Sequence, residues 1–225
     1  MEVFIKTSIG KKLIMSLSGL FLITFLVVHL GVNLLLLFDN SGDLFNKGAH
    51  FMGTNPIIKI MEPLLAVGFL LHIVFSVYLT IENRKARGNS SYATINQKQS
   101  STWASRNMFV LGGVIFGVLV LHIANFYVKL KFGEIPTRII DGVEMEDAYT
   151  LVSGLFINYW WYSAIYMAWA IVLGLHLHHA FWSAFQTIGW SNVKWRNRLT
   201  IIGNIYAIFV ASGFTIIPLY FLLIF

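Results

Sequence analysis

Five long runs of apolar residues constrain the fold of this chain more than any other feature. The runs cover approximately residues 13–38, 57–81, 109–130, 156–187 and 199–225. Because a helix rises about 1.5 Å per residue, about 20 residues cross the roughly 30 Å hydrocarbon layer of a bilayer. A helix also satisfies its own backbone hydrogen bonds there. We therefore predict an all-α bundle of five transmembrane helices that forms a single domain over residues 1–225.

Composition supports this reading and removes several functional classes. Charged residues make up 12% of the chain, which is about half the share in ordinary soluble domains. The absence of Cys excludes disulfide scaffolds, thiolate-ligated metals and thiol catalysis. The net charge of +6 does not indicate a nucleic-acid partner, because the charges lie between apolar runs and not on one soluble face.

The charges predict an orientation in the membrane. Eleven of the sixteen basic residues lie in the N-terminal segment, the second connection and the fourth connection: Lys6, Lys11, Lys12, Arg84, Lys85, Arg87, Lys98, Arg106, Lys194, Arg196 and Arg198. Eight of the ten acidic residues lie on the opposite side. The positive-inside rule then predicts a cytoplasmic N-terminus and an outer C-terminus. We expect an exposed loop at 88–101 and a short hairpin or surface helix within the acidic connection 131–151.

The histidines are unusual for so apolar a chain, since six of the seven lie inside the predicted helices. Counted along the helices from the predicted cytoplasmic side, His29 and His122 lie roughly 25 Å and 22 Å into the membrane. His72 and His176 both lie roughly 15 Å into it. An isolated histidine at such depth usually bonds to a neighbouring helix. Two imidazoles at each of two levels suit two haem irons, each with two axial histidines.

The fourth run offers further histidines. His176 and His179 share one helix face, whereas His178 points away from it. Depth alone does not choose between His176 and His179 as a ligand, so His179 stays an alternative.

The motifs around these histidines resemble a known family. Helix three carries Leu121-His122-Ile123-Ala124-Asn125, and helix four carries Gly174-Leu175-His176-Leu177-His178-His179-Ala180-Phe181-Trp182-Ser183-Ala184-Phe185-Gln186. In this order, over essentially the whole chain, the sequence resembles the dihaem cytochrome b subunit of succinate dehydrogenase/fumarate reductase (complex II), of the five-helix single-anchor type. The resemblance implies two haem b groups: His29 with His122 at the outer, distal level, and His72 with His176 at the inner, proximal level.

The resemblance also implies partners and a cellular role. A flavoprotein and an iron–sulfur subunit would dock on the cytoplasmic face of a bacterial cytoplasmic (inner) membrane. Electrons would pass through both haems between these subunits and a quinone, expected to be menaquinone. The chain would then be an enzyme only as a subunit of the oxidoreductase complex, a step of the tricarboxylic acid cycle, and a higher oligomer of that complex is compatible. The direction, succinate oxidation or fumarate reduction, stays open.

A quinone site needs a proton acceptor near a haem. On the predicted outer side, Glu62, His50 and Asn55 cluster around the start of helix two, and Glu62 is the one carboxylate inside a predicted span. For Glu62 the alternative is a role in capping helix two. For His50 the alternative is that it is a loop residue without a functional role.

Three other functions compete. One is a dihaem anchor of another quinone-linked dehydrogenase, for formate or hydrogen. A second is a proton-coupled transporter that uses the histidines as a relay, although no midplane carboxylate or inverted repeat supports it. A haem-free structural anchor would leave the four histidines without partners.

Overall fold

The computed structural model describes residues 7–87, 103–190 and 192–225, and it is mostly helical, at 86%. Five helices are long and apolar enough to cross a membrane, as expected. They are α2 (Ser8–Leu34, prolonged by a 3-10 turn Leu35–Leu37), α4 (Pro56–Arg87), α6 (Trp103–His122, prolonged by a π turn Ile123–Tyr127 and by α7, Val128–Phe132), α9 (Trp160–Thr187) and α10 (Val193–Ile224). These helices indicate a multi-pass membrane protein.

Several helices begin before the apolar run that predicts them. α2 begins at Ser8 and α10 at Val193, where apolar residues alone predict 13 and 199. Thr7 and Asn192 cap these starts, accepting bonds from the backbone of the first helical turn. Lys and Arg are good helix formers whose long side chains reach polar surroundings, so the helix continues through the basic residues.

The fourth predicted span is wrong at its start. The apolar run predicts one helix from 156, but α9 begins at Trp160 and a separate helix α8 (Ala148–Asn158) precedes it. The break lies at Tyr159, whose φ is −132° and ψ is 86°. Both helices are apolar, so hydropathy does not separate them.

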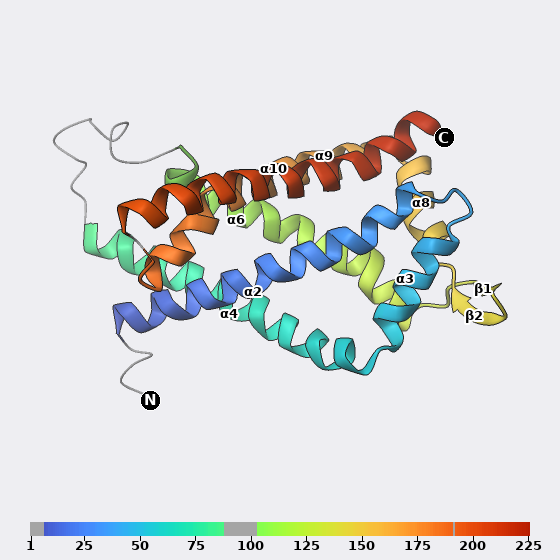
Figure 1. The fold of residues 1–225 in the computed structure, drawn as a ribbon, viewed down its shortest axis with the longest axis horizontal. Coiled ribbons are helices and arrows are strands. Elements are labelled where there is room, and N and C mark those ends of the chain that lie inside the picture. The colour runs from blue at the N-terminus through green and yellow to red at the C-terminus, as the bar shows by residue number, and fades with distance from the viewer. Residues whose placement is uncertain (1–6, 88–102, 191) are drawn as a thin grey trace.

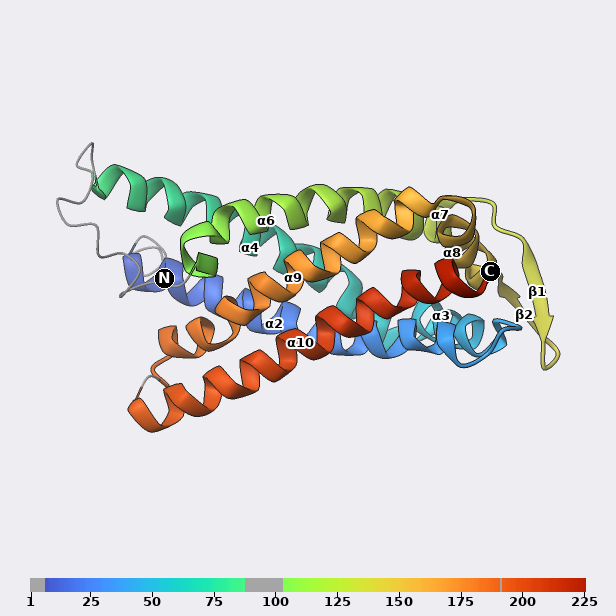
Figure 2. The same ribbon diagram turned by 90° about the horizontal axis from the view of Figure 1, so that it is seen from above.

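The long helices lie side by side and roughly along the long axis of the molecule (Figures 1 and 2). α9 and α10 pack along most of their length. A Cβ at Gly174 of α9 would lie 2.7 Å from the Cβ of Ala211 on α10, closer than real side chains approach. Small residues thus let these two helices pack closely, as is common in membrane bundles. The Tyr206 hydroxyl donates to the Ile23 carbonyl oxygen at 2.7 Å and links α10 to α2.

One end of the bundle, here named the capped end, carries the short elements. These are α3 (Asp43–Thr54), β1 (Thr137–Ile140), β2 (Val143–Glu146) and α8, at the right in Figure 1. The expected hairpin is present, with Asp141 and Gly142 at positive φ in its turn, as a tight type I′ connection requires. The buried Asn46 side chain holds the cap together: Nδ2 donates to Asp147 at 3.1 Å, and Oδ1 accepts from the Tyr149 N–H at 2.8 Å.

The opposite end, here named the basic end, contains the starts of α2, α6 and α10 and the ends of α4 and α9 (left in Figure 2). Most basic residues therefore lie at one end of the bundle and most acidic residues at the other, as the sequence predicts. Lys11 is 8% exposed and donates to Glu82 at 2.7 Å and to the Tyr78 hydroxyl at 3.1 Å. Which end faces the cytoplasm stays a prediction from the positive-inside rule. The predicted loop 88–101 lies outside the described residues.

Candidate functional site

The structure brings the four deep histidines together in two pairs. His29 on α2 faces His122 at the end of α6, with ring centroids 5.7 Å apart. His72 on α4 faces His176 on α9, with ring centroids 6.4 Å apart. These are the two pairs that depth along the helices predicts.

Aromatic rings surround the pair His29–His122, here named the aromatic pair. Their centroids lie between 5.1 and 6.1 Å from one of the two imidazoles: Phe25, Phe126, Tyr166, Trp169 and Phe214. The Tyr166 hydroxyl lies 3.5 Å from Nδ1 of His122 and accepts a hydrogen bond from the Tyr162 hydroxyl at 3.1 Å. The surroundings are therefore apolar apart from two phenols.

Glycines surround the pair His72–His176, here named the glycine-lined pair. A Cβ at Gly19 would lie 3.3 Å from Cε1 of His72, and a Cβ at Gly112 would lie 3.9 Å from Cε1 of His176. The α2 backbone thus passes directly beside the His72 ring. Replacing Gly19 by a larger residue would force that ring to move.

Ser18 lies beside Nδ1 of His72. Its hydroxyl donates to the Met15 carbonyl oxygen at 3.0 Å, and its oxygen lies 3.5 Å from Nδ1 of His72. This contact suits the tautomer in which Nδ1 carries the proton, since the Ser18 hydroxyl proton is already donated. In that tautomer the lone pair lies on Nε2, the form that binds a metal while Nδ1–H bonds to a neighbouring oxygen.

His176, and not His179, takes part in the glycine-lined pair. The His179 ring packs edge-to-face against Trp182, with centroids 5.4 Å apart, and His178 is exposed. Nδ1 of His176 is buried without a hydrogen-bond partner. The structure therefore favours His176 over His179, the alternative that depth along the helix leaves open.

The ring separations of both pairs are compatible with two imidazoles that hold one metal. A metal–nitrogen bond is about 2 Å long and the ring centroid lies about 1 Å behind the nitrogen, so two imidazoles on one metal would have centroids up to about 6 Å apart. The observed 5.7 Å and 6.4 Å lie close to this value. The described residues contain no group of three or more His, Asp or Glu arranged to hold a bare metal ion. A porphyrin supplies the other four ligands itself, so two histidines suffice.

Glu62 has partners that the sequence does not predict. It accepts hydrogen bonds from the Tyr127 hydroxyl and from Lys131 Nζ, the latter at 2.9 Å. It therefore links α4 to the π turn and to α7. The helix cap considered for Glu62 is formed instead by Asn55, whose Oδ1 accepts from the Ile57 N–H at 2.9 Å.

His50 does not lie in a loop, which corrects that alternative. It lies in the last turns of α3, where its carbonyl oxygen accepts from the Thr54 hydroxyl at 2.7 Å. Within the described ranges, no hydrogen bond or ring contact joins His50 or Asn55 to Glu62. The structure thus shows no direct contact between Glu62 and the other two quinone candidates in the described ranges.

Residues beyond those predicted from the sequence surround the histidines. Tyr162, Tyr166 and Trp169 lie four and three residues apart, on one face of α9, and this spacing was a usable signal. The π turn after His122 was not visible in the sequence, although such turns are frequent at functional sites.

No family model matches the chain, and neither does any curated protein or any solved structure. The two histidine pairs and their surroundings are therefore the features that bear on function.

Proposed function

We propose that this chain is the dihaem cytochrome b anchor of a succinate:quinone oxidoreductase. The observation that carries the proposal is the pairing of the four deep histidines, on four different helices, at ring separations that would let each pair hold one iron. Haem iron supplies reversible one-electron transfer. His29 and His122 would hold one group and His72 and His176 the other.

The residues around each pair would hold the imidazoles in place and exclude water. The Ser18 oxygen would accept the Nδ1 proton of His72, which would leave Nε2 free to hold the iron. With Nε2 on iron, His122 would carry its proton on Nδ1, and the Tyr166 oxygen, 3.5 Å away, would accept it. Phe25, Trp169 and Phe214 pack on the aromatic pair and lower the local dielectric, which tunes the potential of a bound group.

Each end of the bundle would have its own exchange partner. The basic end would face the cytoplasm and receive the flavoprotein and iron–sulfur subunits. A membrane quinone, expected to be menaquinone, would react near the capped end. Glu62 is the preferred proton acceptor there, because its carboxylate lies between Tyr127 and Lys131 and is 32% exposed. His50 and Asn55 are weaker candidates, since Asn55 already caps α4.

The experiment that tests this function starts from the complex purified by a tag on this chain. We expect succinate to reduce its haems and formate and hydrogen to leave them oxidised, as followed by the α-band absorbance. Reduction by formate or hydrogen alone would instead assign the chain to another dihaem dehydrogenase. A complex without haem would contradict the proposal and leave a structural anchor or a proton-coupled transporter.

A further inference from the structure

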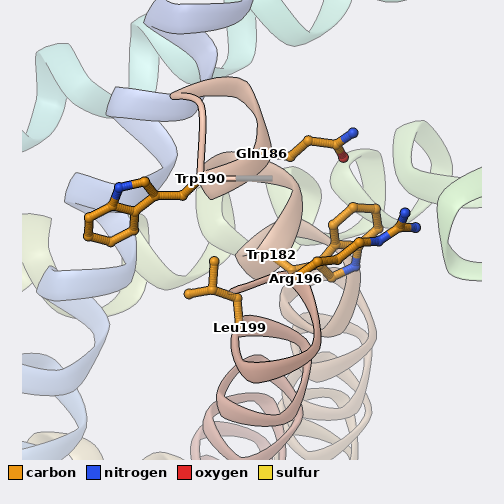
Figure 3. A pocket seen from close by; sticks show the side chains of 5 residues that line it. All are labelled: Trp182, Gln186, Trp190, Arg196 and Leu199. Carbon is orange, nitrogen blue, oxygen red and sulfur yellow. The ribbon is translucent and has the colours of Figure 1, made fainter. Parts of the chain in front are cut away.

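The turn between α9 and α10, at the basic end, forms a small hollow that the proposed electron transfer does not use. Its volume is about 80 Å³. This hollow is here named the turn pocket. It is lined by Trp182, Gln186, Trp190, Arg196 and Leu199. Figure 3 shows Arg196 alongside Trp182, with Gln186 extending to the same side and Trp190 to the other. The hollow thus combines a guanidinium, a carboxamide and two indoles.

The arginines of this turn lie on indole rings. The Arg196 guanidinium lies 5.2 Å from the centroid of Trp182, and that of Arg198 lies 5.5 Å from the centroid of Trp195. A guanidinium stacked in this way keeps its N–H groups directed outward in its own plane. Those groups suit the oxygens of a phosphate, which arginine binds with two parallel hydrogen bonds.

The positive charge here is not balanced within the described part of the chain. None of Lys194, Arg196 and Arg198 has a carboxylate within 4.0 Å, and the first turn of α10 contains no acidic residue. These three cations also lie at the N-terminal end of a helix, where positive charge is unfavourable. Other cations of the described residues do pair with a carboxylate, namely Lys11 at the basic end and Lys47, Lys131 and Arg138 at the capped end. The basic turn therefore favours an external anion.

The position of the turn pocket indicates which kind of anion would bind there. The pocket lies where α10 passes from the basic residues into the apolar segment that begins near Leu199. Large apolar side chains remain exposed beside it: Val193 is 81% and Trp190 52% exposed. Exposed tryptophans beside arginines are typical of the boundary between headgroups and acyl chains. We propose that the turn pocket binds the phosphodiester headgroup of an anionic phospholipid. This site does not depend on haem.

The test is a lipid titration of the purified, delipidated full chain in detergent, followed by native mass spectrometry. The probes are phosphatidylglycerol, phosphatidylcholine and glycerol phosphate. We expect preferential binding of phosphatidylglycerol, and about 10- to 100-fold weaker binding in Arg196→Gln, because this side chain supplies charge-assisted hydrogen bonds to the phosphate. Arg196→Lys should lose most of this binding too, since it keeps the charge but not the planar fork.

Arg84→Gln is the matched control. Arg84 lies at the same end and stacks on Phe109 at 5.5 Å, but it does not line the turn pocket. Equal loss of lipid in Arg84→Gln and Arg196→Gln would overturn the proposal in favour of general surface charge. Equal binding of glycerol phosphate and phosphatidylglycerol would overturn it in favour of a soluble phosphate ligand. If an arginine variant does not elute as a folded monomer, Gln186→Leu takes its place. We expect this variant to show a weaker preference for phosphatidylglycerol than the wild type.

Discussion

The two histidine pairs have the same geometry but opposite surroundings. The aromatic pair is enclosed by five aromatic rings. The glycine-lined pair has the backbone of Gly19 and Gly112 beside its rings. Each pair has a hydroxyl 3.5 Å from one Nδ1, from Tyr166 in the first and from Ser18 in the second.

This difference shows two ways to make room for imidazoles in a crowded bundle. At the glycine-lined pair, the missing side chain of Gly19 makes the room, so the site is sensitive to volume added at that position. At the aromatic pair, rigid rings enclose the imidazoles, so removing one hydrogen bond leaves the packing intact. Changes of volume and changes of hydrogen bonding should therefore affect the two pairs differently.

The largest effect is expected from added volume beside the glycine-lined pair. Gly19→Leu should displace His72, because even a Cβ there would lie 3.3 Å from its ring. We expect the purified variant to lose one of the two proposed haems, as measured by the ratio of Soret absorbance to protein. Gly117→Leu is the control, since a Cβ at Gly117 meets nothing within 4 Å. Equal haem loss in both variants would show that the helices, and not the pair, are disturbed.

A smaller effect is expected from the hydroxyl beside the aromatic pair. An acceptor for Nδ1–H makes an imidazole a stronger donor and stabilises ferric iron, so removing it raises the midpoint potential. Tyr166→Phe should raise the potential of one haem by about 20–60 mV, the equivalent of a typical hydrogen bond. Redox titration followed in the α band measures the shift.

Ser18→Ala is the matched change at the glycine-lined pair. It should raise the potential of the other haem and leave the first unchanged. If either substitution shifts both potentials equally, the hydroxyls do not act on separate pairs.

The fold and the pairing follow from the sequence to different degrees. Helix rise and hydropathy suffice to place His29 with His122 and His72 with His176, because depth in a straight helix depends only on residue count. Rotation about a helix axis does not follow from depth, so only the structure, in which His72 pairs with His176, decides against His179. The bond between Asn46 and Asp147 joins residues 101 positions apart, and no local pattern predicts it.

The smallest effect concerns the capped end, which lies beyond the aromatic pair. Burial raises the pKa of the Asp147 carboxyl, but hydrogen bonds from Thr150 and Asn46 outweigh it, so the pKa lies below its ordinary value. Its stabilising contribution is therefore present above the unfolded pKa of about 4 and is lost as the pH falls through the folded value. We expect Asp147→Asn to lower Tm at pH 7 by about 2–4 °C, the equivalent of about 1 kcal/mol, and to have less effect at pH 3. A difference in Tm that does not change with pH would contradict this assignment.

The central claim is that each histidine pair holds one haem. The most direct test is the haem content per chain of the purified protein, measured as the pyridine haemochromogen, in the wild type and in His72→Ala. We expect two haems in the wild type and one in His72→Ala, with the remaining haem still low-spin. A wild type without haem, or a His72→Ala variant that still binds two, would contradict the claim.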